Sequence, residues 1–106
     1  MDGYKKHPNG GGWVADTATV ADTAFVGPAA MVFDTAVVSG NAQIYGDAVV
    51  SGDATVCGDA RVFGNARVFG NAVVFDTARV FGNARVFGNA RVFDDARVFD
   101  KLKEEK

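Results

Sequence analysis

Alanine returns every six residues from Ala18 to Ala96, and Val or Ile stands two positions after each alanine, from Val20 to Val98. A fixed short period is the signature of a repeat protein, in which similar units stack on one another. One variable residue separates the alanine from the aliphatic residue, so the three alternate between two faces with the two-residue period of a strand. Each six-residue unit, or hexad, is therefore predicted to be a short strand followed by a corner.

The residues that follow each predicted strand have the chemistry of a sharp turn. A typical hexad reads Val62-Phe63-Gly64-Asn65-Ala66-Arg67, and Gly followed by Asn or Asp recurs at most of the corners. Glycine tolerates a positive φ, and Asn and Asp hydrogen-bond to their own backbone in turns. A helix is excluded because a six-residue period does not keep to one face of a 3.6-residue turn, and each interior glycine would cost about 1 kcal/mol.

The hexad resembles that of the left-handed β-helix family, in which an aliphatic residue and the small residue two positions before it both face inward. The resemblance covers residues 14–99 and implies left-handed winding with three hexads per coil, neither of which follows from spacing alone. The expected fold is all-β: a parallel left-handed β-helix, or hexapeptide-repeat solenoid, of between four and five triangular coils. In such a solenoid residue n lies above residue n+18, with neighbouring coils about 4.8 Å apart.

The repeat divides the chain, which at 106 residues is expected to be one domain, into three parts. Residues 1–13 are expected to form an N-terminal cap or loop, residues 14–99 the β-helix, and residues 100–106 a charged C-terminal tail or cap. Both end segments are predicted to cover the open strand edges of the first and last coils.

Aromatic residues dominate the position after the inward aliphatic residue. They are Phe33, Phe63, Phe69, Phe75, Phe81, Phe87, Phe93, Phe99 and Tyr45. With residue n above residue n+18 they are predicted to form the columns Tyr45-Phe63-Phe81-Phe99, Phe69-Phe87 and Phe75-Phe93. One interpretation is that the rings stack and stabilise the coils by about 0.5–1.5 kcal/mol per pair. The other is that they expose more apolar surface than a monomer usually does, so that another copy or a protein partner covers them.

Arginine dominates the position before the inward aliphatic residue. The arginines are Arg61, Arg67, Arg79, Arg85, Arg91 and Arg97. Like charges stacked at strand spacing repel. Two arrangements can compensate this repulsion between the arginines. In one, an acidic partner binds them. In the other, they stack on Phe rings and pair with Asp59, Asp76, Asp94 and Asp95. Arginine and aromatic residues are both enriched at interaction hot spots, which favours a protein interface.

The charge is unevenly distributed along the chain. Residues 1–60 carry Lys5 and Lys6 against seven aspartates, a net charge of −5, whereas residues 61–106 carry nine cations against six anions, a net charge of +3. The two halves are expected to present different faces to partners. Nucleic-acid binding is disfavoured, because the whole chain is acidic, with a pI of about 5.2.

Catalysis is not expected. The family resemblance also covers acyltransferases and carbonic anhydrases, which rely on histidines as the general base or as metal ligands. This chain has a single histidine, His7, which lies in the N-terminal segment outside the hexads. No substrate loop interrupts a hexad, and no Ser-His-Asp arrangement is recognisable. We therefore expect no enzyme activity, no catalytic residue, no cofactor and no bound metal.

The single cysteine, Cys57, excludes an internal disulfide and is expected to be a free thiol in a reducing cytoplasm. No signal peptide or transmembrane run is recognisable, because Asp and Gly interrupt the apolar stretches. The expected location is cytoplasmic, without a membrane partner.

The segment Asn9-Gly10-Gly11-Gly12-Trp13-Val14, followed by Ala-rich hexads, resembles small YdcK-like hexapeptide-repeat proteins of bacteria and their phages. We expect a non-catalytic protein-binding module that forms a homodimer or homotrimer and binds another protein, such as a phage-encoded inhibitor of a host protein or defence complex. The expected interface residues are Arg61, Phe63, Phe69, Arg79, Phe81, Arg85, Phe87, Phe93, Arg97 and Phe99. The alternatives are a structural self-assembly or scaffold module, and a transferase-like trimer that binds a small ligand between subunits.

Overall fold

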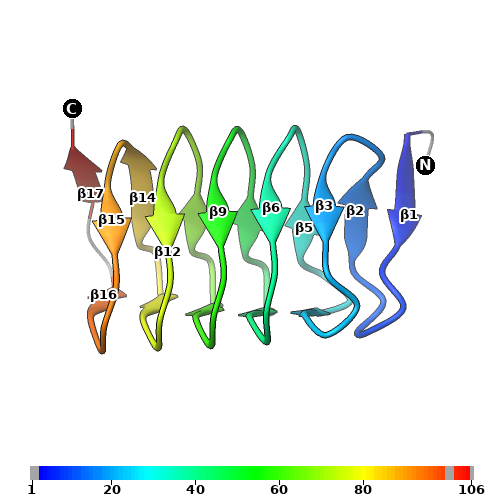
Figure 1. Cartoon of the computed structure of the whole chain (residues 1–106), viewed down its shortest axis with the longest axis horizontal. Coiled ribbons are helices and arrows are strands. Elements are labelled where there is room, and N and C mark those ends of the chain that lie inside the picture. Colours follow the sequence, from blue (N-terminus) through cyan, green and yellow to red (C-terminus); the bar gives the residue numbers. More distant parts are fainter. Residues whose placement is uncertain (1–2, 100–101, 106) are drawn as a thin grey trace.

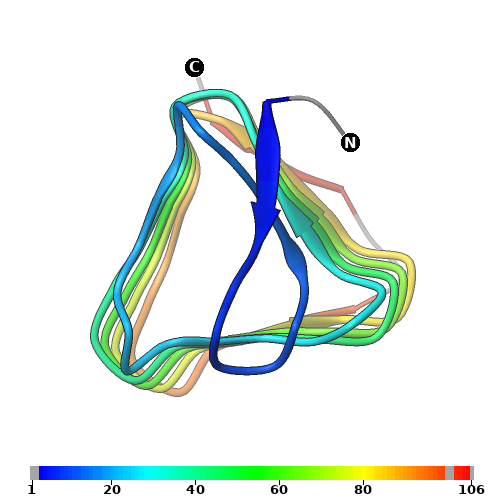
Figure 2. The ribbon, with the colours of Figure 1, turned by 90° about the vertical axis from the view of Figure 1, so that its right-hand side faces the viewer.

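A computed structural model describes residues 3–99 and 102–105. Three sheets of parallel strands, stacked along one axis, form the sides of a triangular prism of about five turns (Figures 1 and 2). The prism is 32 Å long and 22 by 21 Å across. No helix occurs among the described residues, and the predicted all-β solenoid is confirmed. The left-handed winding stays a prediction.

Each side of the prism takes one strand from every coil. The first side contains β2 (Trp13–Ala15), β5 (Met31–Val32), β8 (Val49–Val50), β11 (Arg67–Val68) and β14 (Arg85–Gly88). The second side contains β3 (Thr19–Val20), β6 (Val37–Val38), β9 (Thr55–Val56), β12 (Val73–Val74) and β15 (Arg91–Val92). The third side contains β4 (Phe25–Val26), β7 (Gln43–Ile44), β10 (Arg61–Val62), β13 (Arg79–Phe81) and β16 (Arg97–Phe99).

The register between coils is the predicted one. Val62 pairs with Ile44 on one side and with Val80 on the other, so three hexads complete each coil. Backbone hydrogen bonds join the coils throughout: the Arg61 N–H donates to the Ala78 carbonyl oxygen at 3.0 Å, and the Phe63 N–H donates to the Val80 carbonyl oxygen at 2.9 Å. Since strands of only two residues have few bonds of their own, the repetition of this ladder holds the stack together.

The interior contains the alanine and aliphatic positions of the hexads. Every such alanine from Ala24 to Ala90 and every aliphatic residue from Val26 to Val86 has no exposed surface. The outward assignment of the alternate positions follows from the same burial pattern, since the residue between each pair is half-buried or exposed. The inward and outward positions predicted from the sequence are confirmed from Ala24 to Val92, whereas Ala18 and Val20 are only partly buried and Ala96, in the last coil, is exposed.

The corners require a left-handed backbone conformation. Gly64 has a φ of +69°, and a Cβ atom there would lie 2.9 Å from the Gly82 nitrogen of the next coil. Asp34, Asp76 and Asp94 take the equivalent place in three other corners, with φ of 59°, 62° and 56°. The Asp34 Oδ2 accepts the Gly52 N–H at 3.0 Å, and the Asp76 Oδ2 accepts the Asp94 N–H at 3.2 Å. These hydrogen bonds offset the strain that a side chain with positive φ brings.

A hairpin covers the N-terminal end of the prism. Strand β1 (Tyr4–Lys6) pairs antiparallel with β2 and lies across the triangle in the axial view (Figure 2). His7, which the sequence placed outside the coils without a fixed neighbour, is buried, and its Nε2–H donates to the Ala24 carbonyl oxygen at 2.8 Å. Gly12 must lack a side chain here, because a Cβ atom would lie 2.3 Å from the Gly27 carbonyl oxygen. His7 therefore closes the first coil.

At the other end, β17 (Leu102–Glu105) extends the first side by pairing parallel with β14. Its register differs from that of the coils, because Arg85 pairs with Leu102, one residue short of the n+18 spacing. Residues 100, 101 and 106 of the predicted C-terminal tail lie outside the described residues.

Candidate interaction surface

The residues before the inward aliphatic positions form one outward column on each side, in register from coil to coil. On the first side the column is Trp13, Met31, Val49, Arg67 and Arg85. On the second side it is Thr19, Val37, Thr55, Val73 and Arg91. On the third side it is Phe25, Gln43, Arg61, Arg79 and Arg97. Each column changes from uncharged to cationic towards the C-terminal end.

Aromatic rings stack along the corner that follows the third side. Tyr45 lies 4.9 Å from Phe63 between ring centroids with an angle of 2° between the planes, Phe63 lies 5.1 Å from Phe81, and Phe81 lies 5.2 Å from Phe99. This column is the one predicted from the 18-residue spacing. Offset parallel stacking at such distances is an attractive arrangement of aromatic rings.

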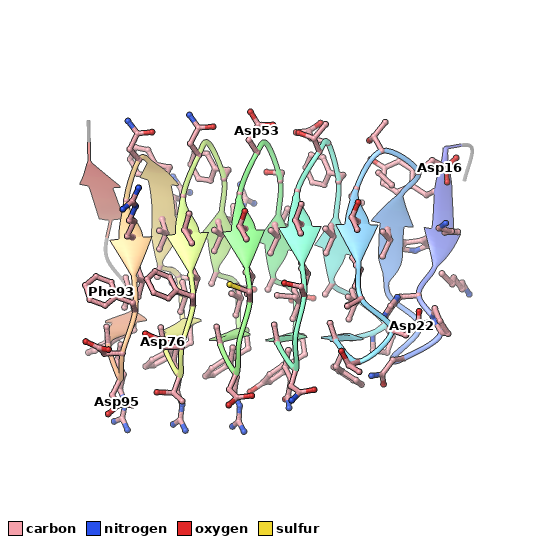
Figure 3. All side chains as sticks on the ribbon, viewed as in Figure 1. Asp16, Asp22, Asp53, Asp76, Phe93 and Asp95 are labelled. Carbon is pink, nitrogen blue, oxygen red and sulfur yellow. The ribbon has the colours of Figure 1, made fainter. Side chains whose placement is uncertain are left out.

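The other two predicted pairs are also stacked. Phe69 and Phe87 lie 5.1 Å apart at the corner after the first side, and Phe75 and Phe93 lie 5.3 Å apart at the corner after the second side. Rings within the stacks are half-buried, whereas the last rings of two columns, Phe93 (labelled in Figure 3) and Phe99, are each 46% exposed. Stacking thus covers more ring surface than the sequence suggested, and the exposed rings gather at the C-terminal end.

The arginines have no acidic partner among the residues that the structure describes. Among residues 3–99, no arginine forms an ion pair with a carboxylate. The only cation over a ring in that range is Lys6, 5.4 Å from the centroid of Trp13. The corner aspartates have other contacts: Asp76 accepts the Asp94 N–H, and Asp95 accepts the Thr77 hydroxyl. The predicted internal compensation of the arginines, by Phe stacking and by Asp pairing, is wrong for the described residues.

A shallow polar hollow of about 320 Å³ lies on the third side, where its column becomes cationic. It is lined by Asn41, Gln43, Asp59, Arg61, Thr77 and Arg79. The guanidinium and amide groups can donate several hydrogen bonds to a carboxylate from outside.

Comparison with known families gives a match within these coils. The family described as YdcK Beta solenoid repeat matches residues 42–58, 60–76 and 78–92. The chain is a β-solenoid, and three consecutive segments of it match the YdcK-type repeat. The predicted resemblance is therefore confirmed for the coils that contain Arg61, Phe63, Arg79 and Phe81. No curated protein and no solved structure matches the chain.

The single cysteine, Cys57, lies in register with Phe75, at the corner after the second side. The Cys57 thiol is half-buried, and desolvation, followed by the nearby Asp76 carboxylate, raises its pKa. A raised pKa disfavours the nucleophilic thiolate.

The described residues contain no group of three or more His, Cys, Asp or Glu side chains placed to bind a metal ion. They also contain no helix with the length and apolar character to cross a membrane.

The 18-residue spacing groups the predicted interface arginines as they lie in the structure. The structure places Arg61, Arg79 and Arg97 on the third side and Arg67 and Arg85 on the first. It also shows that Phe33 belongs to the same corner column as Phe69 and Phe87, separated from them by Ser51. The signal that could have found this gap is the 18-residue spacing itself, applied to every member of the column.

Proposed function

We propose that this YdcK-type solenoid is a non-catalytic protein-binding module that uses its arginine columns to contact acidic surfaces, on copies of itself and on another protein. The observation that carries the proposal is that, among residues 3–99, the arginines stand in register without an ion pair. Neighbouring like charges at about 4–5 Å repel by roughly 1 kcal/mol even in water. An acidic surface laid on the column converts this repulsion into attraction.

The first side is complementary to itself when two copies lie antiparallel. Its C-terminal half presents Arg67 and Arg85, and the corner beside its N-terminal half presents Asp34 and Asp53. Two copies running in opposite directions bring each arginine pair opposite the aspartates of the other copy. The half-buried Val49 and its uncharged neighbours in the column would be covered at the same time. A symmetric dimer of this kind is closed, as most homo-oligomers are.

The third side supports the contact with a different protein. Its column of Arg61, Arg79 and Arg97 is the longest row of arginines on the molecule as described, and the stacked rings of Phe63, Phe81 and Phe99 lie at the adjoining corner. Aromatic residues, including Phe, and arginine are both enriched at protein interfaces. The expected partner carries a row of carboxylates. Whether it belongs to a phage host stays a prediction.

Sedimentation velocity tests the self-association. The wild type is expected to be a dimer in 50 mM NaCl and to dissociate in 500 mM NaCl, because exposed charge pairs are screened by salt. The double substitution Arg67→Gln/Arg85→Gln should weaken the dimer by about tenfold or more. Lys5→Gln is the control, because it also removes one cation but lies on β1 at the N-terminal end of the prism. It should leave the dimer intact.

The same measurement separates the alternatives. Open-ended polymers would favour a scaffold module, and a trimer insensitive to salt would favour the transferase-like arrangement. A wild type that is monomeric at every salt concentration would contradict the self-association. For the third side, Arg61→Gln/Arg79→Gln/Arg97→Gln should abolish recovery of a partner from the native host lysate while leaving the dimer unchanged.

A further inference from the structure

One aromatic column is interrupted by a single small residue. The corner after the first side carries, in register, Ala15, Phe33, Ser51, Phe69 and Phe87. The backbone of Ser51 has the same environment as that of its ring-bearing neighbours. The N–H groups of Phe33, Ser51 and Phe69 each donate to the valine carbonyl oxygen of the next coil, at 3.0, 2.9 and 2.9 Å. Ser51 therefore stands where a ring would complete the stack.

The gap has the width of one ring. Neighbouring rings in the intact stacks lie 4.9 to 5.3 Å apart, so Phe33 and Phe69, two coils apart, are separated by roughly 10 Å. A hollow of about 430 Å³ occupies this place and is lined by Phe33, Val49, Ser51, Arg67 and Phe69. The other ring columns among the described residues are uninterrupted, so this is the one place there where rings flank a gap on both sides.

The rim of the hollow is cationic. Arg67, the one charged residue that lines the hollow, is exposed and forms no ion pair within residues 3–99. The hydroxyl of Ser51, at the base, makes no hydrogen bond to another described residue and can donate to or accept from a ligand. Apolar walls, one polar group at the base and a charge at the rim are typical of a small ligand site.

We propose that the hollow between Phe33 and Phe69 is a binding site for one planar aromatic ring that carries a negatively charged group. The ring continues the stack of the column, with one face on Phe33 and the other on Phe69. The anionic group reaches Arg67 at the rim. An aromatic acid in solution and an aromatic side chain beside acidic residues in a protein share this chemistry.

The first test fills the hollow from within the chain. Ser51→Phe should complete a stack of four rings and raise the melting temperature by roughly 5 °C or more. Ser39→Phe is the matched control, because Ser39 has the same place in its hexad but lies between Ala21 and Cys57, where no ring is present. If Ser51→Phe lowers the melting temperature, or raises it no more than Ser39→Phe does, the hollow does not fit a ring and the proposal is wrong.

The second test is a titration followed by NMR with 3-phenylpropionate, uncharged 3-phenylpropanol and saturated cyclohexanepropionate. We expect saturable binding of 3-phenylpropionate to the wild type. Binding of the alcohol to the wild type, and binding of 3-phenylpropionate to Arg67→Gln, should each be roughly two- to fivefold weaker. No binding to Ser51→Phe is expected. A capped peptide with one Trp between two Asp is titrated in parallel. Binding of the free acid assigns a small-molecule ligand, and binding of the peptide alone assigns a protein side chain. Binding of neither, or binding that Ser51→Phe leaves unchanged, overturns the proposal.

This site and the proposed dimer share Arg67 but can be separated. Ser51→Phe leaves Arg67, Arg85, Asp34 and Asp53 in place, so it should abolish ring binding and preserve the dimer. Arg85→Gln should weaken the dimer and preserve ring binding. The failure of one proposal is therefore distinguishable from the failure of the other.

Discussion

The N-terminal coils, residues 14–60, and the C-terminal coils, residues 61–99, share one interior and differ on the outside. Both are lined by fully buried alanine and valine, with Ile44 the one larger interior residue. Outside, both regions have aspartates at their corners (Figure 3), but the N-terminal coils have uncharged columns on their sides, whereas the C-terminal coils have arginine columns and most of the stacked rings. The fold therefore places little demand on the outward positions, and these can specify binding.

The corner contacts of the two regions differ in part, although the Thr77 hydroxyl of the C-terminal coils also donates to a corner carbonyl oxygen, that of Asp94, at 2.9 Å. In the N-terminal coils, the Thr17 hydroxyl donates to the Asp34 carbonyl oxygen at 2.5 Å, and the Thr23 hydroxyl donates to that of Gly40. In the C-terminal coils, Asn side chains bond to one another, as in Asn71 Nδ2 to the Asn89 Oδ1 at 3.5 Å. Different side chains thus join the same corners, and the backbone geometry is common to both regions.

The largest expected effect comes from the shared interior. Ala66→Leu in the C-terminal coils and Ala42→Leu in the N-terminal coils should each destabilise the protein by about 3 kcal/mol, because neither alanine has exposed surface and a larger side chain overpacks the interior. Urea denaturation followed by circular dichroism measures both. Unequal costs would mean that the two interiors are not equivalent, and tolerance of both changes would reverse the inward assignment.

The second largest effect is expected from the stacked rings on the outside of the C-terminal coils. Phe81→Ser removes two stacked contacts, at 5.1 and 5.2 Å, and should cost about 1–3 kcal/mol while leaving the circular dichroism spectrum unchanged. Ser39→Ala, a change at the equivalent hexad position in the N-terminal coils, should stay within about 0.5 kcal/mol. Equal effects would show that the rings contribute nothing to the coils beyond an ordinary surface residue.

The corner aspartates should have the same importance in both regions. Asp76→Ala leaves a side chain at a φ of 62° and removes the acceptor of the Asp94 N–H, so it should cost about 1–2 kcal/mol. Asp76→Gly relieves the strain and should cost less. Asp34→Ala and Asp34→Gly are the N-terminal counterparts. A glycine variant less stable than the alanine variant would contradict the role of positive φ.

The smallest expected effect concerns Cys57. Burial and then Asp76 raise the pKa of its thiol, so less thiolate is present at pH 8 and alkylation by iodoacetamide should be slower than that of N-acetylcysteine. Asp76→Asn should accelerate the reaction by less than about tenfold, because Asp76 is the lesser cause. Alkylation as fast as that of the free amino acid would mean that the thiol is not buried.

Much of the fold could be predicted because one short period determines it. The six-residue repeat fixed which residues face inward, and the 18-residue register, supplied by a family resemblance, placed Phe63 over Tyr45 and Arg79 over Arg61. Because the hexad recurs, each repeat independently supports the same assignment of inward and outward positions. The same register contained the interruption at Ser51, which becomes a hollow only once the ring planes and their spacing are known.

The features that could not be predicted depend on contacts outside the period. His7 lies outside the hexads, and its burial depends on a hairpin that brings it to the Ala24 carbonyl oxygen. Attraction between Arg79 and the nearby Asp76 was a reasonable expectation from composition. In the structure, however, the Asp76 carboxylate accepts a backbone N–H with one oxygen, as Asp34 also does, and the arginines remain without an ion pair within residues 3–99. Each of these carboxylates keeps a second oxygen that can accept from a residue of another copy. The sequence alone does not show whether a corner carboxylate binds a backbone N–H or an arginine.

Mixing two variants tests the central claim, that arginines of one region bind aspartates of the other region in a second copy. One variant carries Arg67→Gln and Arg85→Gln, and the other carries Asp34→Asn and Asp53→Asn, which keep the corner hydrogen-bonding capacity. Sedimentation velocity at low salt should show each variant alone as a monomer and the equimolar mixture as a heterodimer, because one set of charges is complementary only in the mixture. Two variants that dimerise alone, or a mixture that stays monomeric, would contradict the account.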